Sequence, residues 1–307
     1  MKIAVIGAGA VGGYFGAQLV AAGEDVYFVV NTHSLSTLDS NGLTILSETR
    51  PQRLSSIKAT DDPAAVGHVD IVIFTVKLPD AGATARFIAP LIGPHTIILP
   101  LQNGVEAPHI LAAAVPSTHV AAGCAHIIAA RQETGVILHS GSLAALRFGS
   151  LATEQLPYLK DFECRCRKAK IDARLVEHIW PVLWEKFILL VGISAVTTLN
   201  RRTIGAIRSE PPMREMLKAV MQEAFEVSCA KGIGLAADFV EKKMLDIDKL
   251  PSNMKASMLL DLEAGRRLEL PWLSGAVIRL GKQHGFLTPA NQAVVTGLEA
   301  YVNGSGY

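Results

Sequence analysis

Short runs of β-branched and apolar residues alternate with longer helical segments over the first half of the chain. The run at residues 2–6 is strand-like, ends in a glycine turn, and is followed by a helical segment over residues 14–22 that Gly23 terminates. The next strand is expected at residues 25–30. Later apolar runs, which alternate with helix-like segments such as residues 81–91, span residues 70–76, 96–99 and 120–122. Strands that alternate with helices predict a parallel, doubly wound sheet of the α/β class.

The pattern changes in the middle of the chain. Residues 136–148 read as short strands, and after residues 171–176 the chain is almost entirely helical. We therefore expect an α/β domain over residues 1–178 and an all-helical domain over residues 179–307. The longest uncharged apolar stretch, residues 187–199, is shorter than the about 18 residues that a membrane span needs. It predicts a buried core helix.

Composition narrows the classes of function. The chain has 307 residues, of which 50% are hydrophobic and 19% charged, so disorder is excluded. The net charge of +1 leaves no global electrostatic footprint for nucleic acid or an anionic membrane. The N-terminal apolar run is only as long as a strand, which argues against a signal peptide. Four irregularly spaced cysteines do not form a disulfide framework, so a reducing cytoplasm is expected.

A glycine-rich turn links the first strand to the first helix. The sequence Gly-x-Gly-x-x-Gly covers Gly7, Ala8, Gly9, Ala10, Val11 and Gly12. The first glycine of such a loop allows the tight turn, the second lets the backbone approach a pyrophosphate, and the third lets the helix pack closely on the strand. Because the loop follows a strand and opens a helix, we interpret these six residues as the dinucleotide-binding turn of a Rossmann-type domain.

The end of the second strand bears on the choice between NAD and NADP. An acidic residue there would bind the ribose 2′-hydroxyl of NAD, but the chain reads Val29-Val30-Asn31-Thr32-His33-Ser34. With Asn31 in that place we expect no carboxylate to repel a 2′-phosphate, and NADP is favoured. The arginine that would strengthen this inference is absent, and Arg50 or Arg53 substitutes only if the following loop folds back.

Two further strand ends carry polar side chains. Lys77 follows the run at residues 70–76, and Gln102-Asn103-Gly104 follows the next run. Ligands bind at the carboxyl ends of parallel strands, so with the glycine turn these residues outline one crevice. Taken alone, Lys77 reads equally well as a solvated loop charge, and Asn103-Gly104 as a turn that needs positive φ. We assign Asn31, Lys77 and Asn103 to cofactor binding.

The order of these motifs resembles that of the ketopantoate reductase family (2-dehydropantoate 2-reductases) along essentially the whole chain. That family uses NADPH to reduce a 2-oxo acid in pantothenate biosynthesis. The elements that carry the resemblance are Gly7 to Tyr14, Val76-Lys77, Gln102-Asn103-Gly104, Trp184-Glu185-Lys186, Ser257 to Asp261, Glu269, Gly275 and Gly281 to Asn291.

The resemblance implies roles for four residues. Lys186 matches the catalytic lysine, Glu269 the carboxylate that holds the distal hydroxyl of the substrate, Asn103 an amide for cofactor and substrate, and Ser257 a hydroxyl near the substrate carboxylate. Lys186 also has a physical case, because its apolar surroundings penalise the charged ammonium and lower its pKa toward values suited to proton donation. The alternatives are a snorkelling Lys186, a surface ion pair for Glu269, and a mid-helix hydroxyl for Ser257.

The chain departs from the family pattern where the substrate would bind. The family's catalytic lysine opens Lys-x-x-x-Asn-x-x-x-Asn, three positions on one helix face. Here those positions are Lys186, Leu190 and Ser194. The family's Glu-x-Asp-x-x-Asn-Gly reads Glu-Leu-Pro-Trp-Leu-Ser-Gly from Glu269. We therefore expect reductase chemistry to be retained in an altered pocket, which takes ketopantoate or a related, less polar 2-oxo acid.

Other candidate residues receive structural interpretations. Cys124-x-His126 and Cys164-x-Cys166 lack third and fourth ligands, so no metal is expected. His139 and His284 lack an acidic partner at obvious spacing. The sequence thus predicts an NADPH-dependent oxidoreductase with a small-molecule substrate and no nucleic-acid or membrane partner, with a homodimer left open. The alternative is a redox sensor that keeps the fold and the nucleotide but has lost turnover, and the apolar setting of Lys186 argues against it.

Overall fold

The computed structural model describes residues 1–304, and the chain divides into two compact units. The first consists of Met1–Gln102 and Ala107–Ile179. The second consists of Asn103–Glu106 and the chain from Trp180 onward. A short segment of four residues therefore leaves the first unit and packs with the second.

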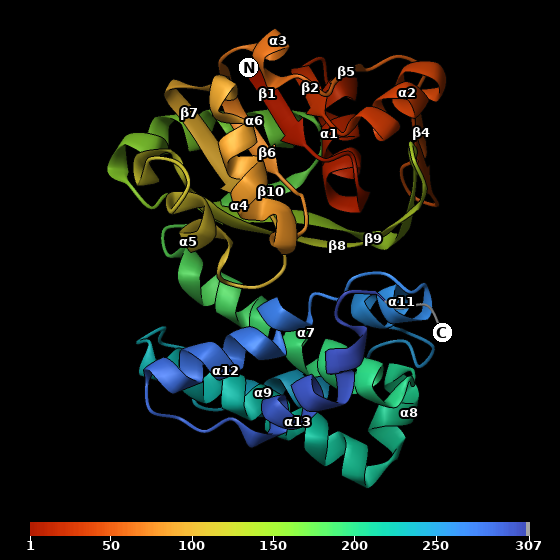
Figure 1. Ribbon diagram of the computed structural model, residues 1–307, viewed down its shortest axis with the longest axis vertical. Coiled ribbons are helices and arrows are strands. Elements are labelled where there is room, and N and C mark those ends of the chain that lie inside the picture. The colour runs from red at the N-terminus through yellow and green to blue at the C-terminus, as the bar shows by residue number, and fades with distance from the viewer. Residues whose placement is uncertain (305–307) are drawn as a thin grey trace. The chain divides into compact units, whose positions relative to one another are not determined.

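A five-stranded parallel sheet forms the centre of the first unit (Figure 1). Its strand order is β5-β2-β1-β6-β7, so the chain moves outward from β1 to β5 and then returns to the other side of β1. The strands are β1 (Lys2–Ile6), β2 (Asp25–Val29), β5 (Lys58–Thr60), β6 (Val69–Phe74) and β7 (Ile92–Pro100). This is the predicted doubly wound sheet, and the prediction is confirmed.

Helices connect these strands and cover the sheet. The helices of the first unit are α1 (Ala10–Ala21), α2 (Thr32–Asn41), α3 (Pro63–Val66), α4 (Leu78–Phe87), α5 (Ala107–Ala112) and α6 (Leu156–Lys168). Short 3₁₀ turns occur at Ala89–Leu91, Ser117–His119 and Thr153–Gln155. The helix expected over residues 81–91 thus begins earlier, because Pro79 occupies a first-turn position of α4, where its missing N–H costs nothing.

A second sheet lies in the same unit and was not expected as such. Its order is β10-β9-β3-β4, with β8 paired to β9, and its strands are β3 (Leu43–Ser47), β4 (Gln52–Leu54), β8 (Ala122–Glu133), β9 (Val136–Gly149) and β10 (Asp172–Leu175). The short strands expected over residues 136–148 are one strand of 14 residues. It is long because β8 pairs with it antiparallel along most of its length, across a turn at Gly135 with φ +81°.

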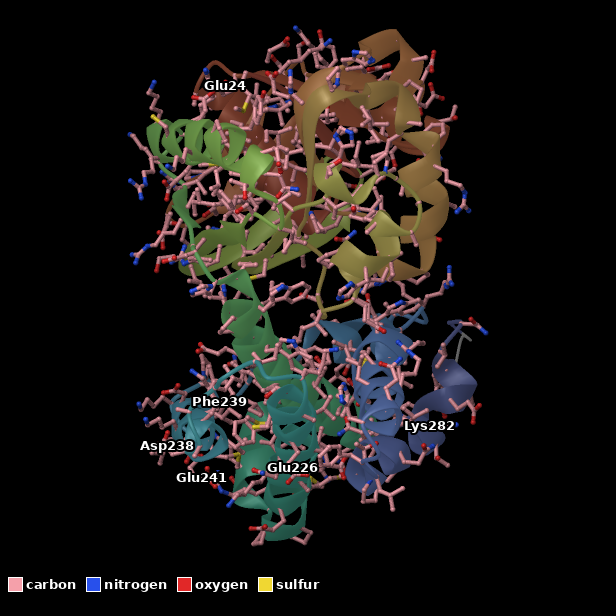
Figure 2. The ribbon with its side chains drawn as sticks, turned by 90° about the vertical axis from the view of Figure 1, so that its left-hand side faces the viewer. Glu24, Glu226, Asp238, Phe239, Glu241 and Lys282 are labelled. Carbon is pink, nitrogen blue, oxygen red and sulfur yellow. The ribbon has the colours of Figure 1, made fainter. Side chains whose placement is uncertain are left out.

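The core of the first unit forms around α1, which contacts both sheets. Apolar side chains of β1 and β2 meet those of β3 and β9 around Tyr14 and Phe15, which are fully buried. At the amino-terminal end of the sheet, Glu24 accepts hydrogen bonds from the chain N-terminus at 3.2 Å and from Arg165 of α6 at 3.1 Å (Figure 2). This buried carboxylate fixes the start of β1 against α6.

The second unit is helical. Its helices are α7 (Ile179–Asn200), α8 (Ile204–Ser209), α9 (Pro211–Ala230), α10 (Phe239–Ile247), α11 (Ser257–Glu263), α12 (Ser274–Gln283) and α13 (Pro289–Leu298), with 3₁₀ turns at Leu270–Trp272 and Glu299–Tyr301. Phe239, labelled in Figure 2, lies at the start of α10. Its ring stacks on that of Phe225 of α9, with ring centroids 6.4 Å apart. Glu223 of α9 caps α13 by accepting the backbone N–H groups of Ala290 and Asn291 at 2.7 and 2.9 Å.

Helix α7 is the long apolar helix of this unit. By length and composition it could cross a membrane, but 67% of its most apolar 18-residue stretch is buried inside the protein. The residues expected as a buried core helix, 187–199, lie within it. This degree of burial is typical of a core helix, as predicted. Lys186 lies near the beginning of α7.

Candidate active site

The glycine turn after β1 is held by its neighbours. Gly7 adopts φ +91°, a region that favours glycine, and its N–H donates to the carbonyl of Val29 at 2.9 Å. The hydroxyl of Thr75, just after β6, donates to the carbonyl of Gly7 at 3.0 Å. A Cβ on Gly12 would lie 2.2 Å from the Gly7 oxygen, so only glycine fits there. The first and third glycines are therefore required by the turn itself.

Gly9 differs from both, because its surroundings are open. Its φ of −78° and ψ of −167° are accessible to any residue, and no atom lies within 4 Å of a Cβ built on it. It is also the N-cap of α1, and within residues 1–304 no side chain caps that helix end and no acidic residue occupies its first turn, which begins with Ala10 and Val11. An uncapped helix N-terminus beside an open backbone fits the pyrophosphate of a dinucleotide.

Asn31 and Lys77 occupy the two strand ends that flank the glycine turn. Strands β2 and β6 both pair with β1 in parallel, so the three carboxyl ends share one edge of the sheet. Lys77 is exposed and precedes α4, as its N-cap residue. The side-chain oxygen of Asn31 accepts the N–H of Ser34 at 2.8 Å and caps α2. Asn31 therefore has a structural role at the position where it was expected to contact cofactor.

A carboxylate does stand beside the end of β2, contrary to our expectation. Asp61 follows β5, and its Oδ2 accepts a hydrogen bond from the Thr32 hydroxyl at 2.7 Å. The expectation was wrong because it considered only the residues that follow β2 along the chain. The acid comes from the neighbouring strand, and the only signal in the sequence was the Asp61-Asp62 pair after a three-residue strand.

The two arginines considered as substitutes lie on other elements. Arg53 belongs to β4, where it stands opposite Thr44 of β3. Arg50 lies next to Tyr14 of α1: burial raises the pKa of the Tyr14 phenol, and the nearby Arg50 guanidinium opposes part of that rise. Neither residue follows β2 or β5 directly.

In the second unit, three of the expected site residues form one hydrogen-bonded chain. The ammonium of Lys186 donates to the Asn103 side-chain oxygen at 3.1 Å, and the Asn103 amide nitrogen donates to Glu269 Oε2 at 3.2 Å. This arrangement fixes the orientation of the amide, because a flipped Asn103 would turn its NH₂ group toward the ammonium and its oxygen toward the carboxylate. All three side chains are half-buried.

Three distant parts of the chain supply this constellation. Lys186 projects from α7, Glu269 precedes the 3₁₀ turn at Leu270–Trp272, and Asn103 comes from the short segment that leaves the first unit after β7. Gly104 adopts φ +94° directly after Asn103, which turns the segment. Glu106 then accepts a hydrogen bond from Arg279 of α12 at 2.6 Å.

The remaining substrate candidates are not equivalent. Leu190 follows Lys186 by one turn of α7 and is half-buried. Ser194, a further turn on, is completely buried, and its hydroxyl has no hydrogen-bond partner among residues 1–304. A direct substrate contact is therefore not available to Ser194 in this arrangement. Ser257 is exposed at the first position of α11, so the mid-helix alternative for it was wrong.

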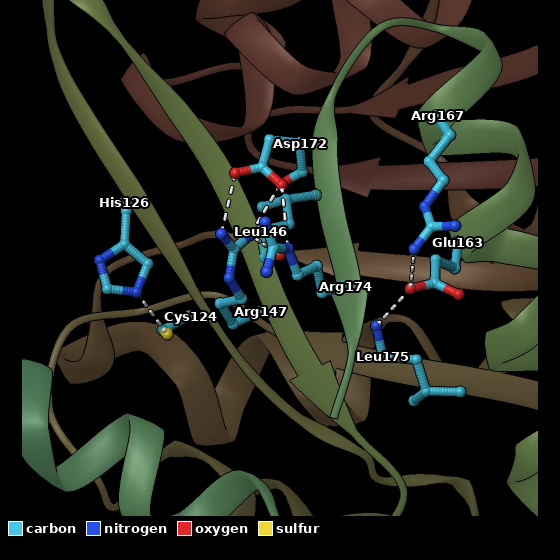
Figure 3. A network of polar contacts seen from close by, with 9 residues as sticks. All are labelled: Cys124, His126, Leu146, Arg147, Glu163, Arg167, Asp172, Arg174 and Leu175. Atoms are coloured by element: carbon cyan, nitrogen blue, oxygen red, sulfur yellow. Dashed lines mark hydrogen bonds and ion pairs between the residues drawn. The ribbon is translucent and has the colours of Figure 1, made fainter. Parts of the chain in front are cut away.

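The cysteine candidates and the histidines His126 and His139 belong to the first unit, whereas His284 is the C-cap residue of α12 in the second. The Cys124 sulfur lies 3.5 Å from His126 Nε2 (Figure 3). Nearby, Arg147 donates to Asp172 at 2.8 Å, and this hydrogen bond holds the Asp172 pKa below its usual range. Both ring nitrogens of buried His139 are engaged, by the Ser47 hydroxyl and the Leu143 carbonyl. Across residues 1–304 no three His, Cys, Asp or Glu side chains gather as metal ligands.

Comparisons with known proteins agree with this architecture. Residues 3–153 match the family model "Ketopantoate reductase PanE/ApbA", and residues 178–302 match its C-terminal counterpart. The 2-dehydropantoate 2-reductase of Halobacterium salinarum is 28% identical over 94% of this chain and 95% of its own length. An uncharacterized oxidoreductase of Bacillus subtilis, YkpB, is also 28% identical, over 98% of this chain and 99% of its own.

A solved structure shows the same fold. The 2-dehydropantoate 2-reductase of Geobacter metallireducens superposes with a TM-score of 0.91 at 26% identity, covering 98% of this chain and 99% of that one. The matches, together with the glycine turn on a doubly wound sheet and the helical unit that carries Lys186, identify the class of the protein as an oxidoreductase. The chain belongs to the ketopantoate reductase family.

Proposed function

We propose that the chain reduces a 2-oxo acid with NADPH, taking ketopantoate or a related, less polar 2-oxo acid as substrate. The observation that carries the proposal is the hydrogen-bonded chain of Lys186, Asn103 and Glu269. It joins a cation, an amide and a carboxylate in a helical unit whose other buried side chains are largely apolar. Such a group can bind a polar substrate and deliver one proton to it.

We assign cofactor binding to residues 1–178 and catalysis to residues 179–307, with Asn103 contributed from the first stretch. The open space over Gly9 and the uncapped start of α1 would hold the pyrophosphate. Gly7, Ala8 and Gly12 shape the turn, and Lys77 and Asn103 would also contact the cofactor. When bound, the nicotinamide supplies a hydride to the carbonyl carbon of the substrate.

Lys186 acts as the proton donor in this proposal. As the carbonyl carbon is reduced, negative charge develops on its oxygen, and the ammonium of Lys186 donates a proton there. Asn103 accepts one of the three Lys186 N–H bonds, which orients the remaining two. Glu269 in turn fixes the Asn103 amide and, as the family resemblance implies, binds a distal hydroxyl of the substrate.

The rest of the substrate pocket is expected to be less polar than in relatives with two amides on this helix. Leu190 presents a methyl surface one turn after Lys186. A leucine cannot hydrogen-bond to a substrate hydroxyl, and any hydroxyl buried against it loses its water without compensation. Ser257 remains a candidate for the substrate carboxylate, since it is exposed at the start of α11.

NADPH oxidation by the purified protein with a panel of 2-oxo acids tests the proposal. The panel includes ketopantoate and 2-oxo acids of similar length with apolar side chains. Saturable turnover of at least one member is expected. Tight NADPH binding with no turnover of any member would instead support the alternative, a redox sensor on the same fold.

The setting of the protein follows from the same proposal. We expect an enzyme of the cytoplasm, in line with four free cysteines. Its partner is a small-molecule substrate, and we expect no nucleic-acid or membrane partner. A homodimer stays a prediction.

A further inference from the structure

We propose that Asp61 reads the 2′ position of the adenosine ribose and weakens the preference for NADPH, so that NADH also serves as cofactor. This inference rests on the proposed function, because it concerns how the same dinucleotide site selects its ligand. It assigns the discrimination to a residue outside the strand that usually supplies it.

Asp61 lies at the carboxyl edge of the sheet, beside the end of β2. Strand β5 pairs with β2 in parallel, with Val29 opposite Thr60, and the N–H of Val30 donates to the Thr60 carbonyl at 2.9 Å. The residue after Thr60 therefore leaves the sheet beside the residues that follow Val30. The Thr32 hydroxyl holds the Asp61 carboxylate there at 2.7 Å.

In a doubly wound site an acid at the end of the second strand accepts a hydrogen bond from the ribose 2′-hydroxyl. Here that strand end offers Asn31, whose side-chain oxygen already caps α2. Asp61 supplies the missing carboxylate from the adjacent strand. A carboxylate accepts a hydrogen bond from a hydroxyl but repels a phosphate dianion at the same place.

The neighbouring Asp62, unlike Asp61, stabilises a helix end. Asp62 is the N-cap of α3, and its Oδ1 accepts the Ala64 N–H at 2.9 Å. Within residues 1–304 Asp61 caps no helix, and its carboxylate accepts a hydrogen bond from the Thr32 hydroxyl. Asp61→Asn removes the charge while the amide oxygen can still accept from Thr32. Asp62→Asn removes an equal charge one residue away and keeps a good helix cap, so it is the matched control.

The experiment measures the dissociation constants of NADPH and NADH for the wild type and both variants, by calorimetric titration without substrate. In the wild type the two constants are expected within about tenfold of each other. Asp61→Asn should shift their ratio toward NADPH by about tenfold. The variant loses a charge-assisted hydrogen bond to the 2′-hydroxyl of NADH and no longer repels the 2′-phosphate of NADPH. Asp62→Asn should shift the ratio less than about twofold.

Two results would overturn the proposal: an unchanged ratio in Asp61→Asn, or an equal shift in Asp62→Asn, which would mean a general charge effect. Asp61→Ser, which also removes the charge, gives a second variant if Asp61→Asn folds poorly. The proposed function fails differently. If the wild type binds neither cofactor, the assignment of a dinucleotide site is wrong. A change in the ratio of the two dissociation constants can be observed only when both cofactors bind.

Discussion

Arg279 and Glu106 join the helical unit to the segment that carries Asn103. The guanidinium of Arg279 on α12 donates to Glu106 Oε2 at 2.6 Å, three residues beyond Asn103. Arg279 is half-exposed and Glu106 mostly buried, with 47% and 21% of their side-chain surfaces accessible. An ion pair this exposed contributes little to the free energy of unfolding. Its expected role is to hold the four-residue segment in place against α12. Because Asn103 lies in the same segment, we expect the ion pair to influence where the Asn103 amide meets Lys186.

Arg279→Gln should lower kcat/KM by about two- to tenfold, because a loosened segment misplaces Asn103 by a fraction of an ångström. Glu106→Gln should have a similar effect, and the double variant should lose little more than either single one. Steady-state kinetics of the three variants checks this. Arg214→Gln breaks a different ion pair of the same length, Arg214–Asp248 at 2.6 Å, and should leave the kinetics unchanged. Additive losses in the double variant would rule out coupling through the ion pair.

Gly9→Val should abolish NADPH binding in a protein that remains folded. The backbone of Gly9 suits any residue and a Cβ there meets no atom within 4 Å, so the valine fills space that the pyrophosphate needs. Calorimetric titration with NADPH and a thermal unfolding curve measure the two effects separately. Gly82→Ala, at another open glycine, is the control and should bind normally. If Gly9→Val binds NADPH as tightly as the wild type, the glycine loop is a structural turn and not a pyrophosphate-binding site.

Gly12→Ala, in contrast to Gly9→Val, should destabilise the fold. A Cβ at this position would lie 2.2 Å from the Gly7 carbonyl and 2.3 Å from the Thr75 hydroxyl, so the turn itself must shift. The expected loss of stability is about 1–3 kcal/mol, the usual cost of overpacking. Denaturant unfolding of the variant without cofactor measures it. A variant as stable as the wild type would mean that the turn adapts, and the third glycine would then be explained by cofactor binding alone.

The parallel sheet and the glycine turn could be predicted because local sequence encodes both. The apolar run at β1 is short, its end is marked by Gly7, and the next helix starts within three residues. The second sheet could not be predicted as a sheet, because β3 and β9 are far apart in sequence and pair only in the folded chain. A pattern of alternating residues shows that a strand exists but not which strand it joins.

The site residues divide in the same way. Lys186 stands out in the sequence as a charge within an apolar helix, and Asn103 as part of a strand-end turn. Their hydrogen bond, and that between Asn103 and Glu269, connects positions 83 and 166 residues apart, which no spacing rule reveals. Asp61 was missed for this reason. It follows a strand of three residues, and only the pairing of β5 with β2 places it beside Thr32.

Lys186→Ala should lower kcat by about 10² to 10⁴-fold while the affinity for NADPH stays close to that of the wild type. The lysine acts on the carbonyl oxygen of the substrate rather than on the phosphates of the cofactor, so chemistry and cofactor binding should separate. Single-turnover kinetics and a cofactor titration measure the two. Lys282→Ala, on the exposed surface of α12, is the control and should behave as wild type. Full turnover by Lys186→Ala would remove this lysine from the mechanism.

Leu190→Asn should change which 2-oxo acid the enzyme prefers. Leu190 lies one turn after Lys186 on α7 and is half-buried, so an amide there would stand beside the proton donor. In the wild type a hydroxylated substrate such as ketopantoate meets a leucine that offers no hydrogen bond, and an apolar 2-oxo acid of the same length should be used better. Leu190→Asn should raise kcat/KM for ketopantoate relative to the apolar acid by about two- to tenfold, the contribution of one hydrogen bond of about 0.5–1.5 kcal/mol. Leu190→Met keeps an apolar side chain of similar volume and should leave the ratio of the two kcat/KM values unchanged. Efficient reduction of ketopantoate by the wild type, together with an unchanged ratio in Leu190→Asn, would show that Leu190 does not face the bound substrate.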